Sequence, residues 1–473
     1  MQKEADNFQS PFSWRYGSIQ MRTVFSEKHT RLNWRKIWVA LAQAQSKFGL
    51  VSPQELKDIA SHSQDVDIQK SLEFEKQTKH DVVAEIKVYA SQCKTGGGKI
   101  HLGATSMDIV DNAEALAMKQ GLQVLRERTA LLLKKLKPKI EDNQNTVCMA
   151  YTHLQPAEPT TLGYRFASYG QDFLEDLGAL EWVYDSIQGK GFKGAVGNSA
   201  SYVQLLGSKE KAVQMEETAM KHLGLDAYEI TTQTYPRKQD FFVLSKLSSL
   251  AQSLHKMAFD LRLMQNKETN EPFGEKQVGS SAMPFKRNPM KTERICSLAR
   301  LVPAYAQMAW ENASLSALER TLDDSANRRV FMPEAFLALD ECLIQSAKVI
   351  EGLQINRAYI SKTIDQYGPF AATEKIMAEL AKRGFDRQEA HELLRVHSLK
   401  AWASVQEGKE NPLFDLVAGD SRVTKLIPRK ELEKQFDVSS HVGLAPEKSV
   451  KIAGEIDEAT KEYKTTGASE QGF

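Results

Sequence analysis

Residues 279–294 combine side chains that could do acid–base chemistry on an anionic substrate. Two neighbouring hydroxyls, Ser280 and Ser281, are followed by several cations and by the amide of Asn288. A helix is predicted to restart after Pro289, so its free N–H groups and the positive end of its dipole lie beside this loop. Such a place can hold a carboxylate. By composition alone, a solvated basic loop explains the segment equally well.

A second segment, residues 151–157, places His153 between hydroxyl, amide and proline residues. A histidine side chain exchanges protons near neutral pH, which suits an acid or a base. The run Gly96–Gly97–Gly98–Lys99 is no phosphate-binding Walker loop, because Ile100 follows where serine or threonine is required.

The order of residues in these segments resembles a known superfamily. Ser-Ser-x-Met-Pro-x-Lys-x-Asn-Pro at 280–289 matches the signature of the fumarase/aspartase superfamily. Within it, this segment and residues 152–157 and 319–329 resemble the adenylosuccinate lyase family, in its animal-like branch. Residues 101–106 and 233–235 are further matches. The resemblance runs from about Arg15 to about residue 400 and fades beyond it.

The resemblance implies a carbon–nitrogen lyase that eliminates fumarate. A proton must leave the carbon beside a carboxylate, and fixed donors must meet the charge that develops there. A second group must protonate the leaving nitrogen. The family's general base corresponds to Ser280, with Ser281 as the alternative, and its general acid corresponds to His153, oriented by Glu293. Neither a metal nor a cofactor is expected.

The resemblance also implies a set of substrate-binding residues. Lys286 and Asn288 correspond to residues on the succinyl carboxylates, and Thr105 and Ser106 to a carboxylate-binding hydroxyl pair. The remaining contacts are Arg15, Tyr16, Ser325 and Arg329 on the phosphate, Arg294 and Arg320 as further arginines, Gln233 near the reacting centre, and the segment Lys79, His80 and Asp81. Lys79 stands where the family commonly has arginine, so it supplies charge but not a planar fork.

Helical periodicity predicts the elements that must position these residues. Apolar residues recur every three or four positions over residues 118–140, 162–187 and 240–264, which places each set on one helix face. Asp240 is a candidate cap for the third helix. Because strand-like alternation is nearly absent, we expect an all-α, fumarase/aspartase-like fold in three parts, with a central bundle of long helices.

Three parts are predicted: a helical N-terminal domain (1–105), a central bundle that also mediates oligomerisation (106–355) and a helical C-terminal domain (356–473). A polar tail, 465–473, is expected to be disordered. Three irregular stretches, 94–107, 189–202 and 270–289, interrupt the helices. Loops of this length between long helices are more often functional than idle.

Composition excludes several classes of protein. A net charge of +1 supplies no general field for nucleic acid or an anionic membrane. The four cysteines have no C-x-x-C spacing, which fits a reducing compartment. No apolar run is long enough to span a bilayer, and the N-terminus is no signal peptide. We therefore expect a cytoplasmic protein with no membrane or nucleic-acid partner.

The expected partners are a nucleotide substrate and further copies of this chain. The family resemblance implies a homotetramer whose active sites gather motifs from three subunits, while periodicity alone also fits an intramolecular bundle. The implied substrates are adenylosuccinate, giving AMP, and the succinyl-aminoimidazole-carboxamide ribotide of purine nucleotide biosynthesis. The alternatives are another superfamily lyase, such as argininosuccinate lyase or fumarase, and a non-catalytic structural relative.

Overall fold

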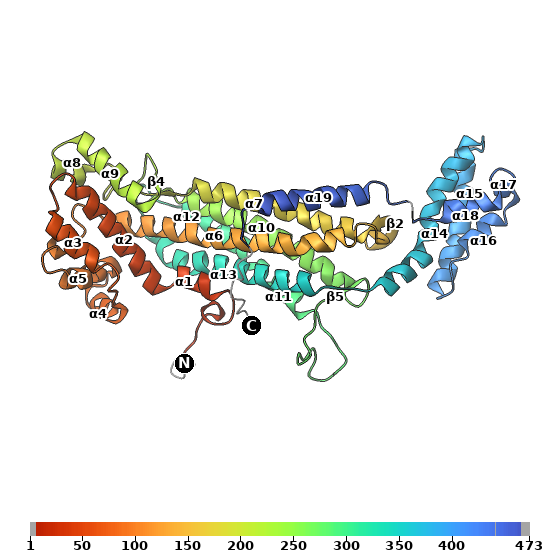
Figure 1. The fold of residues 1–473 in the computed structure, drawn as a ribbon, viewed down its shortest axis with the longest axis horizontal. Coiled ribbons are helices and arrows are strands. Elements are labelled where there is room, and N and C mark those ends of the chain that lie inside the picture. Colours follow the sequence, from red (N-terminus) through yellow and green to blue (C-terminus); the bar gives the residue numbers. More distant parts are fainter. Residues whose placement is uncertain (1–5, 440, 465–473) are drawn as a thin grey trace.

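The computed structural model describes residues 6–439 and 441–464, and the tail predicted to be disordered lies outside them. The chain forms a long rod of parallel and antiparallel helices with a smaller helical part at each end (Figure 1). The rod contains α6 (Ser106–Glu141), α7 (Leu162–Ser186), α10 (Lys238–Met264), α11 (Met290–Ala299), α12 (Leu301–Ser314) and α13 (Asp323–Gly352). This confirms the predicted all-α class and the bundle of long helices.

The three periodic runs all form helices of the rod. On α10 the periodic residues from Val243 to Leu261 are almost fully buried, as an apolar stripe on one face requires. Asp240 does not cap this helix, because α10 already begins at Lys238. Its buried carboxylate instead accepts hydrogen bonds from Tyr235 and Arg328. The capping prediction is therefore wrong, and the residue has a tertiary role.

One antiparallel hairpin was not predicted. It consists of β1 (Val147–Thr152) and β2 (Gln155–Thr161), and its two-residue turn is His153–Leu154. Pro156 and Pro159 argue against a strand, and the turn lacks the usual Asn-Gly signal. The remaining strands are two-residue pairs: β3 (Gln188–Gly189) with β4 (Asp226–Ala227), and β5 (Thr269–Asn270) with β6 (Gln354–Ile355).

The N-terminal end of the rod is a cluster of shorter helices. Its helices are α1 (Ile19–Val24), α2 (Glu27–Ser46), α3 (Pro53–Ser61), α4 (Ile68–Thr78) and α5 (Asp81–Gln92), joined by α8 (Ala200–Leu206) and α9 (Lys209–Leu223) from the middle of the chain. Helix α2 packs against both α6 and α9. The glycine-rich stretch 189–202 lies beside the start of α6, where the Asn112 amide donates to Gly191 O and Asp108 accepts the Lys193 N–H.

The C-terminal part has an apolar core of its own. It contains α14 (Arg357–Lys382), α15 (Arg387–Gln406), α16 (Leu413–Ala418), α17 (Ser421–Thr424) and α18 (Arg429–Phe436). The last helix, α19 (Ala445–Thr460), returns to the rod and packs on α6 and α7 (Figure 1). The segment predicted as one C-terminal domain thus contributes to two bodies.

None of the helices within residues 6–439 and 441–464 combines the length and apolarity that a membrane crossing requires.

Candidate active site

His80 and Ser106 meet at the end of the rod where α6 begins. His80 is the N-cap of α5, and its Nδ1 accepts the backbone N–H of Val83 at 3.4 Å. Its Nε2 lies 3.3 Å from Oγ of Ser106, the first residue of α6. Because Nδ1 is an acceptor, the ring proton of the neutral form sits on Nε2, directed at Ser106. The pair could donate hydrogen bonds to a carboxylate at this helix N-terminus.

Asp81 and Arg329 form an ion pair beside His80. Arg329 lies in the second turn of α13, and its NH2 is 2.6 Å from Oδ2 of Asp81. Burial of Asp81 opposes its ionisation, but the hydrogen bond and charge of Arg329 outweigh burial and lower the pKa of Asp81. Lys79 immediately precedes this pair and is exposed, in a left-handed conformation with φ 55°.

A buried charge network connects three more predicted residues to the same end of the rod. The backbone N–H of Gln233 donates to Glu319 O at 3.1 Å, and Arg320 NH1 lies 2.7 Å from Asp324. Asp324, the neighbour of Ser325, also binds Arg237, whose guanidinium reaches Asp111 of α6. Thr105, Ser106, His80, Asp81, Gln233, Arg320, Ser325 and Arg329 are therefore held at one end of the rod, which we call the α6-start region.

Arg15 and Tyr16, in the segment before α1, form a second group with Arg294 of α11, beside α13. The guanidinium carbon of Arg294 is 5.7 Å from the centre of the Tyr16 ring, and its NH1 is 3.4 Å from Glu341. The neighbouring Gly17 N–H also donates to Glu341. Arg15 lies against the rings of Trp14 and Tyr16.

His153 occupies the tip of the β1–β2 hairpin, at the opposite end of the rod from α5 (Figure 1). His153 and Leu154 both have positive φ, 53° and 60°, which β-hairpin turns of two residues require but non-glycine residues adopt at a cost. Both side chains are exposed. Strain of this kind is often retained where function demands it.

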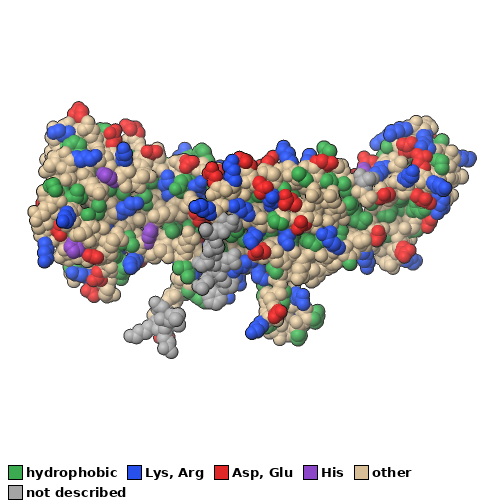
Figure 2. Space-filling view, viewed as in Figure 1, with side chains coloured by type: hydrophobic (Ala, Val, Ile, Leu, Met, Phe, Trp, Pro, Cys, Tyr) green, Lys and Arg blue, Asp and Glu red, His purple; other side chains and the backbone are tan. Residues whose placement is uncertain are grey.

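Ser280 lies in the loop that joins β5 to α11, and the loop projects clear of the rod (Figures 1 and 2). Its Oγ accepts the backbone N–H groups of Ala282 at 3.3 Å and Met283 at 3.1 Å. Two donors aimed at one oxygen stabilise negative charge on it. Ser281 is exposed and, among the described residues, has no such pair of donors.

Three other predicted residues share this segment. The Asn288 amide donates to Gly279 O at 2.8 Å and closes the loop, which we call the signature loop (271–289). Lys286 is exposed at its outer part. Glu293 is exposed in the first turn of α11, and within the described chain it makes no hydrogen bond to His153. The predicted orienting contact is therefore not formed inside one chain.

One chain does not assemble the predicted site. Helix α6 has 36 residues, so it separates Ser106 from the hairpin end of the rod by about 50 Å. The signature loop is also at the far end, because α10 runs from the buried network at Arg237 to Met264, and Gln265 donates to Arg287 O. Ser106 and His80 are thus remote from both His153 and Ser280.

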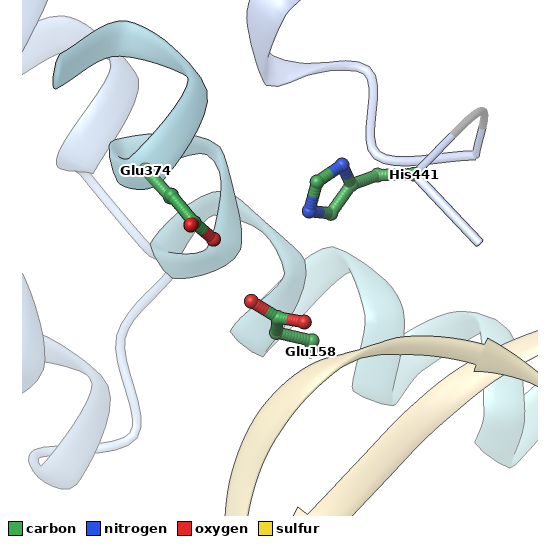
Figure 3. A group of neighbouring side chains, drawn as sticks. All are labelled: Glu158, Glu374 and His441. Atoms are coloured by element: carbon green, nitrogen blue, oxygen red, sulfur yellow. The ribbon is translucent and has the colours of Figure 1, made fainter. Parts of the chain in front are cut away.

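One cluster of possible metal ligands lies away from all of these groups. Glu158 of β2, Glu374 of α14 and His441 point toward one another, with their ligand atoms within 4.8 Å (Figure 3). Both glutamates are exposed, as surface acidic groups commonly are without a metal. The cluster lies where β2 of the hairpin packs against α14 of the C-terminal part.

The buried charged residues that hold the α6-start region were not predicted from the sequence. Asp108, Asp111, Lys190 and Arg237 are all almost fully buried. From the sequence alone these charged residues are expected to be exposed, because charged side chains are almost never fully buried unless they are paired. The sequence feature that pointed to these buried residues was the glycine-rich stretch 189–202, for which no specific role was predicted.

Two family models match this chain over most of its length. One described as "Lyase" matches residues 15–303, and one described as "Adenylosuccinate lyase C-terminus" matches residues 369–450. The second match extends the resemblance to residue 450, beyond the residue 400 inferred from motifs. Adenylosuccinate lyase from Schistosoma mansoni is 37% identical over 98% of this chain and 97% of its own length. This chain belongs to the adenylosuccinate lyase family.

Other relatives support the same family assignment. Adenylosuccinate lyases from Saccharomyces cerevisiae and Pyrococcus abyssi are 38% and 34% identical, over 94% and 96% of this chain and 94% and 97% of their own lengths. The family makes the chain a carbon–nitrogen lyase. A fumarate lyase from Mesorhizobium sp. BNC1 superposes with TM-score 0.83 at 22% identity, over 95% of this chain and 99% of that one. At this identity the likeness shows the fold alone, which is the fumarase/aspartase-like helical fold.

Proposed function

We propose that this chain cleaves adenylosuccinate to AMP and fumarate, and likewise cleaves the succinyl-aminoimidazole-carboxamide ribotide, in purine nucleotide biosynthesis. The observation that carries the proposal is the pair of backbone N–H groups on Ser280 Oγ, inside a loop with the family's signature. We place the reaction in the cytoplasm, because the four cysteines are free and buried, as in a reducing compartment.

Ser280 acts as the general base. A neutral serine hydroxyl is a weak base, so Ser280 acts as an alkoxide that has first lost its proton to solvent, and this negative charge must be stabilised until the alkoxide takes up the substrate proton. The two N–H groups provide this, and Lys286 and Asn288 bring charge and hydrogen bonds to the succinyl carboxylates. Ser280 removes the proton beside one carboxylate, and the electron pair spreads into that carboxylate.

His153 acts as the general acid. It donates a proton to the nitrogen as the carbon–nitrogen bond breaks, so fumarate and the free amine leave. Glu293 of another chain orients the imidazole. His80, with its proton on Nε2, and Ser106 bind a carboxylate at the start of α6, while Arg329 and Ser325 take the phosphate. Arg15, Tyr16, Lys79, Asp81, Gln233, Arg294 and Arg320 complete the substrate contacts.

The site forms between copies of this chain, in a homotetramer. Packed antiparallel, the rods would bring the α6-start region of one copy to the hairpin and signature loop of others. Exposed apolar side chains on α7, α10 and α12 support this assembly: Trp182, Phe242, Phe259, Leu263 and Trp310 are 40–56% exposed. Beside them, a groove of about 370 Å³ runs between α10 and α12. Exposed apolar side chains that gather on neighbouring helices often mark interfaces.

The test is release of fumarate from adenylosuccinate by the purified full-length chain, followed by ultraviolet absorbance. We expect fumarate and AMP in equal amounts, and fumarate also from the ribotide. Release from argininosuccinate instead would assign the chain to another superfamily reaction. Inactivity on every succinyl substrate would identify a non-catalytic relative.

A further inference from the structure

We propose that Asp108 is a positioning residue: with Lys190, it fixes the carboxylate-binding pair Thr105 and Ser106 against the glycine-rich loop 189–202. The inference rests on the proposed function, because it concerns how the succinyl half of the same substrate is held. It also gives a role to a loop that neither the catalytic groups nor the phosphate contacts use.

Asp108 is the third residue of α6, and its side chain is completely buried. Both carboxylate oxygens accept hydrogen bonds from segments far apart in the sequence. The partners are Thr105 N at 3.1 Å, Lys193 N at 3.2 Å, Gly194 N at 3.2 Å, the Tyr202 hydroxyl at 3.1 Å and the ammonium of Lys190. One carboxylate thus joins the turn before α6, the glycine-rich loop and α8.

Further contacts hold the loop and the turn together. Asn112, one turn after Asp108, exchanges two hydrogen bonds with the backbone of Gly191, at 3.0 and 3.1 Å. Ser201 Oγ donates to Gly103 O at 2.7 Å. A side chain at Gly189 would collide with the Asn112 amide, so only glycine lets the loop approach α6 this closely.

The charge pair makes this arrangement stiff. Lys190 is also fully buried, and it additionally donates to Gly194 O at 2.9 Å. If the loop moved away from the turn, it would leave a buried carboxylate or ammonium without its partner, which is strongly unfavourable. The loop and residues 103–106 therefore move as one body.

This body sets the position of Ser106 relative to His80. The Ser106 hydroxyl is 3.3 Å from His80 Nε2, and His80 belongs to the separate helix α5. A carboxylate bound here must reach the Ser106 hydroxyl, the His80 ring and the N-terminus of α6 at the same time. A shift of about 1 Å in such a group can lower the rate by about 100-fold. Loss of Asp108 should therefore weaken binding of the succinyl half selectively.

The decisive measurement uses the reverse reaction, which takes fumarate and AMP as separate substrates. For Asp108→Asn in the full-length enzyme, we expect the KM for fumarate to rise about tenfold and the KM for AMP to change less than about twofold. An amide presents an N–H donor to a site lined with donors, so the turn loses its anchor. Equal changes in both KM values, or no change in either, would overturn the proposal.

A matched control separates positioning from general stability. Glu85 and Arg35 form another fully buried ion pair, at 2.8 Å, in the N-terminal part. Glu85→Gln should lower the melting temperature and leave both KM values unchanged. The double variant Asp108→Asn/Lys190→Met removes the unpaired charge, so it should regain thermal stability while the fumarate KM stays high. A fumarate KM that recovers together with stability would contradict the positioning role.

Tyr202→Phe keeps the inference testable if Asp108→Asn does not fold. It removes one hydrogen bond to Asp108 and retains the ring. We therefore expect the KM for fumarate to rise about two- to threefold and the KM for AMP to stay unchanged. An unchanged fumarate KM would contradict the inference. A wild-type enzyme with no fumarate release would instead defeat the proposed function, so the two failures are distinguishable.

Discussion

At the residue scale, the chemistry depends on where single polar atoms find donors. Ser280 Oγ faces two backbone N–H groups, and His80 Nδ1 accepts a third, which fixes where its proton sits. Both effects come from backbone groups, which cost no reorganisation during the reaction. The burial and hydrogen bonds of single side chains also decide whether carboxyl groups elsewhere in the rod are ionised.

Substitution of the two neighbouring serines tests the assignment of the base. Ser280→Ala should lower kcat by about 10²–10⁴-fold, the usual contribution of a general base. Ser281→Ala is the matched control and should retain most activity, since no donor pair within the described part of the chain faces its hydroxyl. Initial rates of fumarate release measure both. A larger loss in the Ser281 variant would reverse the assignment.

Asp176 of α7 predicts a pH dependence of stability. Burial raises its pKa to about 6, although bonds from Ser253 and Ser249 oppose this. A raised pKa means that stability is fully present below the unfolded pKa, near 3.8, and is lost as pH rises through about 6. The loss amounts to about 3 kcal/mol at most.

Asp176→Asn should remove this dependence. The variant should unfold at a higher temperature than the parent at pH 8, and the gap should shrink toward pH 5. Thermal unfolding followed by circular dichroism at the two pH values measures it. A gap of equal size at both would show that Asp176 is ionised throughout.

At the element scale, the β1–β2 hairpin and the signature loop hold His153 and Ser280, the two groups proposed to be catalytic, toward the far end of the rod. The hairpin is anchored by Arg165, whose NH2 donates to Met149 O at 2.5 Å and whose NH1 pairs with Glu268. Glu268 stands just before β5, so the roots of the hairpin and the signature loop share one buried ion pair. The tips of both remain exposed, where a neighbouring chain can meet them.

Gly279 should be essential to the shape of the signature loop. A side chain there would collide with the backbone carbonyl of Lys286. Gly279→Ala should therefore reduce kcat/KM by about tenfold or more without changing the melting temperature, because the loop projects from the rod. At Gly274 a new side chain would find its nearest atom at 3.7 Å, so Gly274→Ala is the control. Equal effects of the two substitutions would show that general loop flexibility, rather than this close approach, matters.

At the scale of the whole molecule, the length of the rod separates residues that must act together. The residues of the α6-start region cannot reach His153 of the same chain, because α6 lies between them. An antiparallel partner would place its hairpin end beside them, and the exposed apolar residues of α7, α10 and α12 would be covered in the process. Under the proposed function, the oligomer would then be part of the active site.

Complementation between inactive chains tests this. His153→Ala and Ser280→Ala should each be nearly inactive alone. Mixed after reversible dissociation, they should regain a fraction of the parent rate, because some sites receive both intact groups from different subunits. Separate tetramers of each variant, mixed without dissociation, are the control. Failure to regain activity in verified mixed tetramers would mean that both groups come from one chain.

The sequence determined the helical class, the three long periodic helices and the family to which the chain belongs, because apolar periodicity and contiguous motifs are local properties. It did not reveal the hairpin under His153, whose prolines hide two strands that are held by tertiary contacts with Arg165 and α14. Nor did it reveal Asp108, Lys190 and Arg237, since a charged residue can be buried only where distant segments bring its partner. Only the tertiary structure placed the predicted residues at opposite ends of one rod, and that separation follows from the length of uninterrupted helix between them.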